Sequence, residues 1–163
     1  MDDPSSFARF CLPYIGEEVV DLGCGDGRDL YFFINNNIDA WGVDPAISDD
    51  INIYDMSVSD YIQMYPSPKY VYTRFFWHAI TREEQLAVLD WTRRWLFIEA
   101  RTTRDAERNK YFPIHDRNYV NVSQLVQDLK ERNFEIEFLE EGTGMSTYKN
   151  EDPHLVRVIA WKR

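Results

Sequence analysis

The chain has 163 residues and a formal net charge of −10, a size that favours a single domain and a charge that argues against a nucleic-acid binder driven by positive charge. Hydrophobic residues make up 44% of the chain, enough for a buried core, so we exclude an intrinsically disordered protein. We expect residues 1–163 to form one domain. Because no run of about 18 apolar residues occurs, we expect no membrane span.

The two cysteines, Cys11 and Cys24, are too few for a disulfide framework, and no Cys/His cluster has the spacing of a zinc site. The first six residues are acidic and lack the basic-then-apolar pattern of a secretory signal. We therefore expect free thiols, a cytoplasmic location and no bound metal.

The first expected element is a short amphipathic helix within residues 5–15, capped by Ser5 or Ser6. Its apolar side chains at Phe7, Phe10 and Leu12 should face inward. The sequence leaves open whether this helix covers a bound ligand or only the edge of a sheet.

A glycine loop follows the first expected strand, residues 17–22, and precedes a helix that begins near Arg28. Three glycines alternate at Gly23, Gly25 and Gly27. Glycine tolerates positive φ and allows a ligand to approach the backbone, and the free N–H groups of the following helix favour a carboxylate. The loop matches neither the dinucleotide fingerprint G-x-G-x-x-G nor the P-loop, which requires a Lys and a Ser or Thr.

The second and third expected strands, residues 40–43 and 51–56, each lead to a carboxylate. Asp44 follows the glycine loop by about 20 residues, where nucleotide-binding units place an acid that accepts hydrogen bonds from ribose hydroxyls. Pro45 ends the second strand, and residues 46–50 are too few for a crossover helix, so we expect a turn. Asp55 either contacts a ligand or caps the helix expected over residues 57–64.

The second half of the chain continues the alternation of strands and helices. Thr81 and Glu84 form a capping pair for a helix whose apolar face includes Leu86, Leu89 and Trp95. Further strands are expected over residues 69–73, 96–100, 134–139 and 155–161, a helix over 122–132, and a polar insert over 101–120. This alternation predicts a parallel sheet, and the loop between the last two strands predicts that the final strand is antiparallel.

The loop Asp-x-Gly-x-Gly-x-Gly over residues 21–27 resembles motif I of the class I S-adenosylmethionine (SAM) dependent methyltransferases. The resemblance implies an α/β fold, Rossmann-like and arranged as a three-layer sandwich, with a mostly parallel seven-stranded sheet and an antiparallel last strand. It also implies SAM as cofactor and S-adenosylhomocysteine (SAH) as product. The cofactor-binding residues expected from it are Asp21, Gly23, Cys24, Gly25, Gly27, Asp44, Pro45, Asp55 and Met56.

Residues 74–80, 99–105 and 115–119 resemble segments of small methyltransferases from bacterial capsule and surface-glycan gene sets. That resemblance implies a glycan or a phosphorylated precursor as methyl acceptor. Trp77 departs from the pattern, because Leu is expected at its position.

Cationic side chains gather in the segments that should bind the acceptor. The expected acceptor-binding residues are Arg74, Trp77, His78, Arg101, His115 and Arg117. Arg74 is the candidate clamp for a phosphate or carboxylate, and His78 is either a general base, an anion ligand or a core histidine. We take Arg74 and His78 as the catalytic candidates.

These observations predict a SAM-dependent O-methyltransferase for an anionic small molecule or saccharide, acting as a monomer or homodimer. The alternative is a SAM-binding sensor or partner subunit without transfer activity. Methylation of nucleic acid is disfavoured, because the chain lacks an Asn-Pro-Pro-Tyr type motif and its net charge is negative.

Overall fold

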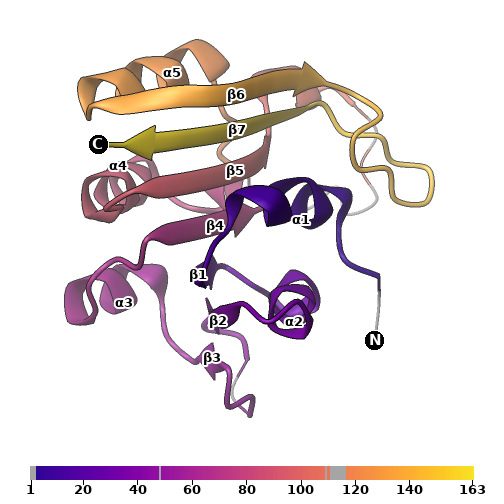
Figure 1. Cartoon of the computed structure of the whole chain (residues 1–163). Helices are drawn as coiled ribbons and strands as arrows, with labels where there is room; N and C mark the ends of the chain where they lie inside the picture. Colours follow the sequence, from indigo (N-terminus) through magenta and orange to yellow (C-terminus); the bar gives the residue numbers. More distant parts are fainter. Residues whose placement is uncertain (1–2, 48, 109, 111–116) are drawn as a thin grey trace.

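The computed structural model describes residues 3–47, 49–108, 110 and 117–163 and shows a central sheet with helices on both faces (Figure 1). Within these residues, seven strands form one sheet in the order β3-β2-β1-β4-β5-β7-β6. The strands are β1 Glu18–Leu22, β2 Asp39–Val43, β3 Ile53–Tyr54, β4 Tyr70–Arg74, β5 Trp95–Arg101, β6 Phe134–Gly142 and β7 Leu155–Lys162. The first five strands pair in parallel and β7 runs antiparallel to β5 and β6, which confirms the predicted fold class.

The helices form the outer two layers of a three-layer sandwich. They are α1 Ser6–Cys11, α2 Arg28–Asn35, α3 Val58–Met64, α4 Arg82–Trp91 and α5 Val122–Glu131. Helices α1 and α2 cover one face of the sheet, where Phe7 and Phe33 are fully buried. Helices α3, α4 and α5 cover the other face, where Leu89 and Leu129 are fully buried. Helix α1 therefore covers a face of the sheet.

Side-chain caps fix the first residues of the helices. Ser5, Ser57, Thr81 and Asn121 each accept a hydrogen bond from the backbone N–H three residues later, at 3.0 to 3.2 Å. Each such cap contributes about 1 kcal/mol to stability. Ser57 caps α3, so the alternative interpretation of Asp55 as the helix cap is wrong.

Two sequence-based expectations about element boundaries are also wrong. The third strand is limited to Ile53–Tyr54, because Ile53 N–H bonds to the Asp50 carbonyl at 3.1 Å in a turn and Ile51 is fully exposed. Trp95 lies in β5, because α4 ends at Trp91 with Gln85, Val88 and Leu89 as its buried face.

The parallel strands place their carboxyl ends at one edge of the sheet. The glycine loop follows β1, Asp44 follows β2, Asp55 follows β3, and Arg74 and Arg101 end β4 and β5. Ligands of open α/β sheets bind outside this edge, so the fold brings the predicted site residues to the expected place.

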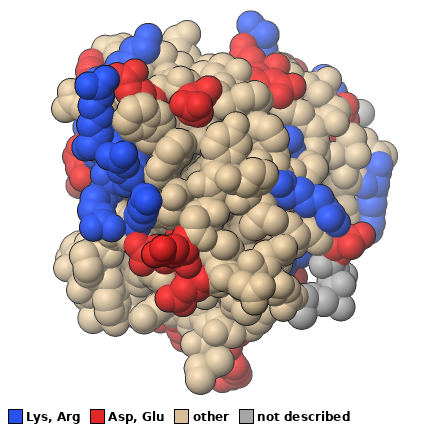
Figure 2. Space-filling view, viewed as in Figure 1, with Lys and Arg blue, Asp and Glu red and all other residues tan. Residues whose placement is uncertain are grey.

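The surface charge is uneven despite the net negative charge. Figure 2 shows Lys and Arg side chains along the left flank, where Figure 1 places the C-terminus and the start of β5. This flank lies at the amino ends of the parallel strands. Its charges therefore lie away from the edge that carries the predicted site.

Both cysteines are free, as expected. In this part of the chain, no group of three or more His, Cys, Asp or Glu side chains is arranged to hold a metal ion. No helix in the described ranges has both the length and the apolar character needed to cross a bilayer.

Candidate cofactor and acceptor site

The glycine loop adopts the backbone that its sequence predicts. Gly23, Gly25 and Gly27 have φ of +72°, +55° and +86°, a region that other residues rarely adopt. A Cβ on Gly23 would lie 2.4 Å from the Phe76 ring, whereas a Cβ on Gly25 would have no atom within 4 Å. Gly23 is therefore required by packing, and Gly25 leaves open space above the loop.

Asp44 joins the glycine loop to the end of β2. Its carboxylate accepts hydrogen bonds from the N–H groups of Gly25 and Ala46, both at 2.9 Å. Each carboxylate oxygen can accept a second hydrogen bond, so Asp44 can still receive ribose hydroxyls. Pro45 follows in an exposed turn.

A pocket of about 300 Å³ opens between the glycine loop and the end of β4. It collects side chains from β1, the loop, α2, β4 and the connection between β6 and β7. Its lining residues are Asp21, Gly23, Cys24, Asp26, Arg28, Asp29, Arg74 and Tyr148.

Asp21 is the most deeply buried group with an unusual pKa among the residues that line this pocket. Its side chain is buried, with 3% of the residue exposed, and no other described residue makes a hydrogen bond or an ion pair with its carboxylate. Burial raises the pKa of Asp21 well above its usual value, and Asp29 and Asp44 raise it further, while Arg74 opposes them. A ligand ammonium group beside Asp21 would supply the missing positive partner.

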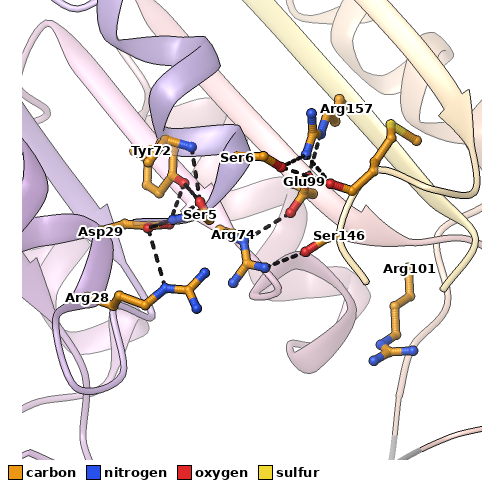
Figure 3. Close-up of polar contacts among 12 residues, drawn as sticks. Ser5, Ser6, Arg28, Asp29, Tyr72, Arg74, Glu99, Arg101, Ser146 and Arg157 are labelled. Carbon is orange, nitrogen blue, oxygen red and sulfur yellow. Dashed lines mark hydrogen bonds and ion pairs between the residues drawn. The ribbon is translucent and has the colours of Figure 1, made fainter. Parts of the chain in front are cut away.

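Asp29, by contrast, is saturated with donors. It accepts hydrogen bonds from the Ser5 N–H, the Ser5 hydroxyl and the Tyr72 hydroxyl, each at 2.7 Å (Figure 3). These contacts join α1, α2 and β4. Asp29 therefore fixes the helix that covers the sheet, whereas Asp21 and the exposed Asp26 are the other carboxylates of the pocket lining.

Arg74 enters the pocket from β4 and is oriented by two partners. Its Nε donates to Glu99 at 3.0 Å and its Nη2 donates to Ser146 at 2.7 Å. Glu99 is fully buried and also binds Arg157, whose Nη2 reaches the Ser6 hydroxyl at 2.7 Å. Figure 3 shows Arg28 and Arg74 on the lower side of this network, with Glu99 above Arg74 and joined to it by a hydrogen bond.

Phe75 is the one bulky residue at this edge with a left-handed backbone, among those that the structure describes. Its φ is 53°, a rare value for an aromatic residue. The Arg74 guanidinium carbon lies 4.2 Å from its ring centroid and that of Arg101 lies 5.5 Å away. Such strain concentrates at functional sites, so Phe75 joins the candidates for acceptor contact. The sequence analysis did not include Phe75 among the candidate site residues.

His78 and Trp77 lie deeper than expected for acceptor-binding residues. Trp77 is 2% exposed and packs in the core, and His78 is 5% exposed. The His78 Nδ1 accepts the Arg101 backbone N–H at 3.0 Å. Burial lowers the pKa of His78 to about 3, and the charges of Arg101 and Arg117 lower it further. This placement favours a structural histidine over a general base.

The pH dependence of stability tests this reading of His78. A folded-state pKa of about 3 against the ordinary 6.5 makes protonation favour the unfolded chain. The stability that neutral His78 contributes is therefore present above about pH 6.5 and is lost as the pH falls toward about 3. His78→Asn keeps an acceptor for the Arg101 N–H and removes this titration. In urea unfolding, the variant should lose roughly 1–2 kcal/mol less than the unmodified protein between about pH 7 and about pH 5. Equal losses would show that His78 is accessible to protons in the fold.

Arg101 lies in a buried ion cluster with acids of the neighbouring loops. It donates to Asp105 at 2.8 Å and forms an ion pair with Glu151. Its charge is therefore committed to structure, and Arg117 is half-buried close enough to lower the pKa of His78. His115 lies outside the described residues.

The two residues expected beside the adenine differ in their exposure. Asp55 is exposed directly after β3, and Met56 is half-buried against the core. Burial raises the pKa of the Cys24 thiol, so it stays protonated. A Cβ on Gly42 would lie 2.4 Å from the Cys24 sulfur, so Cys24 fills the space that Gly42 leaves.

Sequence reasoning missed the contribution of the segment between β6 and β7. Ser146 binds Arg74, Tyr148 lines the pocket, and Arg157 of β7 completes the Glu99 pair. The signal was the length of the connection after Gly142, which exceeds what two antiparallel neighbours require. Arg28 and Asp29 belong to the same missed group, although both follow the predicted motif directly.

Solved structures resemble this fold, whereas no protein-family model and no curated protein matches the sequence significantly. A SAM-dependent methyltransferase from Archaeoglobus fulgidus matches with a TM-score of 0.69 and 19% identity, over 94% of this chain and 90% of its own. Magnesium protoporphyrin IX methyltransferase (ChlM) from Synechocystis PCC 6803, with bound SAH, matches with a TM-score of 0.71 and 13% identity, over 97% and 80%. The 1,6-didemethyltoxoflavin-N1-methyltransferase from Burkholderia thailandensis, also with SAH, matches with a TM-score of 0.68 and 12% identity, over 96% and 76%.

These similarities at low identity concern the fold. They carry no information on an acceptor, and the resemblance to capsule and surface-glycan methyltransferases stays a prediction. Topology, glycine-loop geometry and structural neighbours agree on one conclusion: the chain has the fold of the class I SAM-dependent methyltransferases.

Proposed function

We propose that this protein transfers a methyl group from SAM to an oxygen atom of an anionic small molecule or saccharide. The observation that carries the proposal is the pocket between the glycine loop and β4, which brings the largely buried Asp21 carboxylate and the Arg74 guanidinium into one lining. The named activities of the structural neighbours differ from one another, so the acceptor is inferred from this chain alone.

The residues around the pocket fit the parts of SAM. Asp21 is suited to the ammonium group, and the N–H groups at the start of α2 together with Arg28 are suited to the carboxylate. Asp44 is suited to the ribose hydroxyls, and Asp55 and Met56 to the adenine. When bound, SAM supplies a methyl group already activated by its sulfonium. The protein then needs to align the acceptor oxygen with that methyl group.

An acceptor that is already ionised removes the need for a general base. A phosphate or carboxylate oxygen carries no proton at neutral pH, which agrees with the burial of His78 and its low pKa. Arg74 is the guanidinium that reaches the pocket with Glu99 and Ser146 to orient it. We assign Arg74 to acceptor positioning, with the half-buried Arg117 adding positive potential nearby.

Transfer of a labelled methyl group tests the proposal. We expect label from SAM in sugar phosphates and uronic acids, and none in the matched neutral sugars. Label in the neutral sugars or on a nitrogen acceptor would contradict the assignment. SAH binding without transfer to any member of this set would favour the sensor or partner-subunit alternative.

A further inference from the structure

The connection between β6 and β7, residues 143–154, is longer than the two to five residues that join most antiparallel neighbours. It is nevertheless tied to the rest of the molecule along its length. The Met145 carbonyl accepts hydrogen bonds from the Ser6 hydroxyl at 2.8 Å and from Arg157 at 3.0 Å. The Ser146 hydroxyl accepts from Arg74 at 2.7 Å.

The second half of the connection is held equally well. Gly144 N–H donates to the Asp152 carboxylate at 2.7 Å, and His154 N–H donates to the buried Asp105 carboxylate at 2.8 Å. Glu151 forms an ion pair with Arg101. The connection is therefore a built part of the site edge, anchored to α1, β4, β5 and β7.

Tyr148 lies at the tip of this connection. It exchanges two backbone hydrogen bonds with Glu151, both at 2.9 Å, across a tight turn in which Lys149 has a φ of 53°. Its side chain lines the pocket together with Gly23, Cys24 and Arg28, yet the residue is 56% exposed. A bound ligand would cover part of this aromatic surface and exclude water from it.

Tyr148 also offers the pocket a group that recognises cations. The pocket already contains the Asp21 carboxylate, and an aromatic face attracts ammonium and sulfonium groups through its quadrupole. The Lys149 ammonium lies 5.4 Å from the centroid of this ring, so the ring already accepts a cation. Together, the Tyr148 ring and the Asp21 carboxylate would bind the amino-acid end of the ligand. The adenosine end is served by different residues, Asp44, Asp55 and Met56.

We propose that residues 143–154 form an outer wall of the cofactor pocket and that Tyr148 binds the amino-acid end of SAM. This inference rests on the proposed function. It assigns a binding role to a segment that lies in sequence far from the glycine loop and carries no motif.

The proposal predicts that the effect of Tyr148 depends on the ligand used. SAH contains the amino-acid end, whereas 5′-methylthioadenosine lacks it and retains adenine, ribose and sulfur. By calorimetry, Tyr148→Ala should weaken SAH binding about five- to twentyfold and leave 5′-methylthioadenosine binding unchanged. Tyr148→Phe should bind both ligands as the unmodified protein does. Leu139→Ala removes another partly exposed apolar side chain, on β6, and serves as the matched control.

The possible outcomes separate this inference from the proposed function. Unchanged SAH affinity in Tyr148→Ala would show that Tyr148 does not bind the ligand, and the proposed function would stand. Equal weakening of SAH and 5′-methylthioadenosine binding would also overturn the role of Tyr148, because it would indicate a purely structural side chain. Absence of SAH binding by the unmodified protein would overturn the proposed function and the inference with it.

Discussion

Asp21→Asn should weaken SAH binding about a hundredfold and, at the same time, stabilise the protein without ligand. The loss of affinity, roughly 3 kcal/mol, follows from replacing a charged acceptor for the ligand ammonium with a neutral amide. The gain in stability follows because the Asp21 carboxylate is buried without a partner and lies near two other acids. Removing that charge should raise the free energy of unfolding by about 1–3 kcal/mol.

The sign of the pH dependence makes this prediction specific. Because the folded-state pKa of Asp21 is raised above 3.8, protonated Asp21 favours the fold, and that contribution is lost as the pH rises through the folded-state pKa. The stability gain of Asp21→Asn should therefore be present at neutral pH and vanish below about pH 4. SAH affinity of the unmodified protein should rise with pH over the same window, because binding favours the charged carboxylate.

Urea unfolding and calorimetry at several pH values measure both effects. Asp39→Asn removes an exposed carboxylate at the opposite end of the sheet and is the control for net charge. An Asp21→Asn variant that loses stability at neutral pH would show that the carboxylate has a partner in the fold.

Glu99→Ala should be the most destabilising substitution in the described network. Glu99 is completely buried, with 0% of the residue exposed. Its carboxylate forms ion pairs with Arg74 and with Arg157. Burial raises the pKa of Glu99 although both arginines oppose that shift, so the charged carboxylate depends on its two partners. Removing it leaves two guanidinium groups uncompensated, which costs about 3–5 kcal/mol.

Thermal unfolding measures the loss directly. For a chain of this size the expected cost lowers Tm by roughly 6–20 °C. Glu135→Ala, an exposed glutamate on β6, should have little effect. Glu99→Gln retains the shape and two polar atoms of the side chain. Its loss of stability should therefore lie between those of Glu99→Ala and Glu135→Ala. If Glu99→Ala matched Glu135→Ala in stability, Glu99 would not be the centre that joins α1, β4 and β7.

The fold could be predicted from local signals. Alternating strand and helix patterns set the parallel order, and the absence of a helix between the last two strands indicated the antiparallel ending. The errors concern element boundaries that are set by tertiary contacts. The third strand is shortened by the turn at Asp50, and Trp95 joins β5 because α4 ends at Trp91.

The cofactor half of the site was predictable for the same reason. Its residues follow one another within the loop, and Asp44 occurs at a fixed distance from it. The acceptor half was less predictable, because the sequence does not show which cations are neutralised. Arg101 proved to be paired with Asp105 and Glu151, and His78 proved to be buried. Arg74 is also paired, with Glu99, but it lines the pocket. Tyr148 reaches the pocket because the connection between β6 and β7 folds back toward the glycine loop, and the length of that connection was its one sign in the sequence.

Titration with SAH measures directly whether the pocket above the glycine loop binds SAM. We expect one SAH per chain with a Kd at or below about 100 μM, and at least tenfold weaker binding by Gly25→Ala, whose Cβ would enter the open space above the loop. Asn37→Ala carries comparable left-handed strain at the end of α2 and should bind SAH normally. No binding at about 1 mM SAH, or equal affinity in Gly25→Ala, would show that this pocket is not a SAM site.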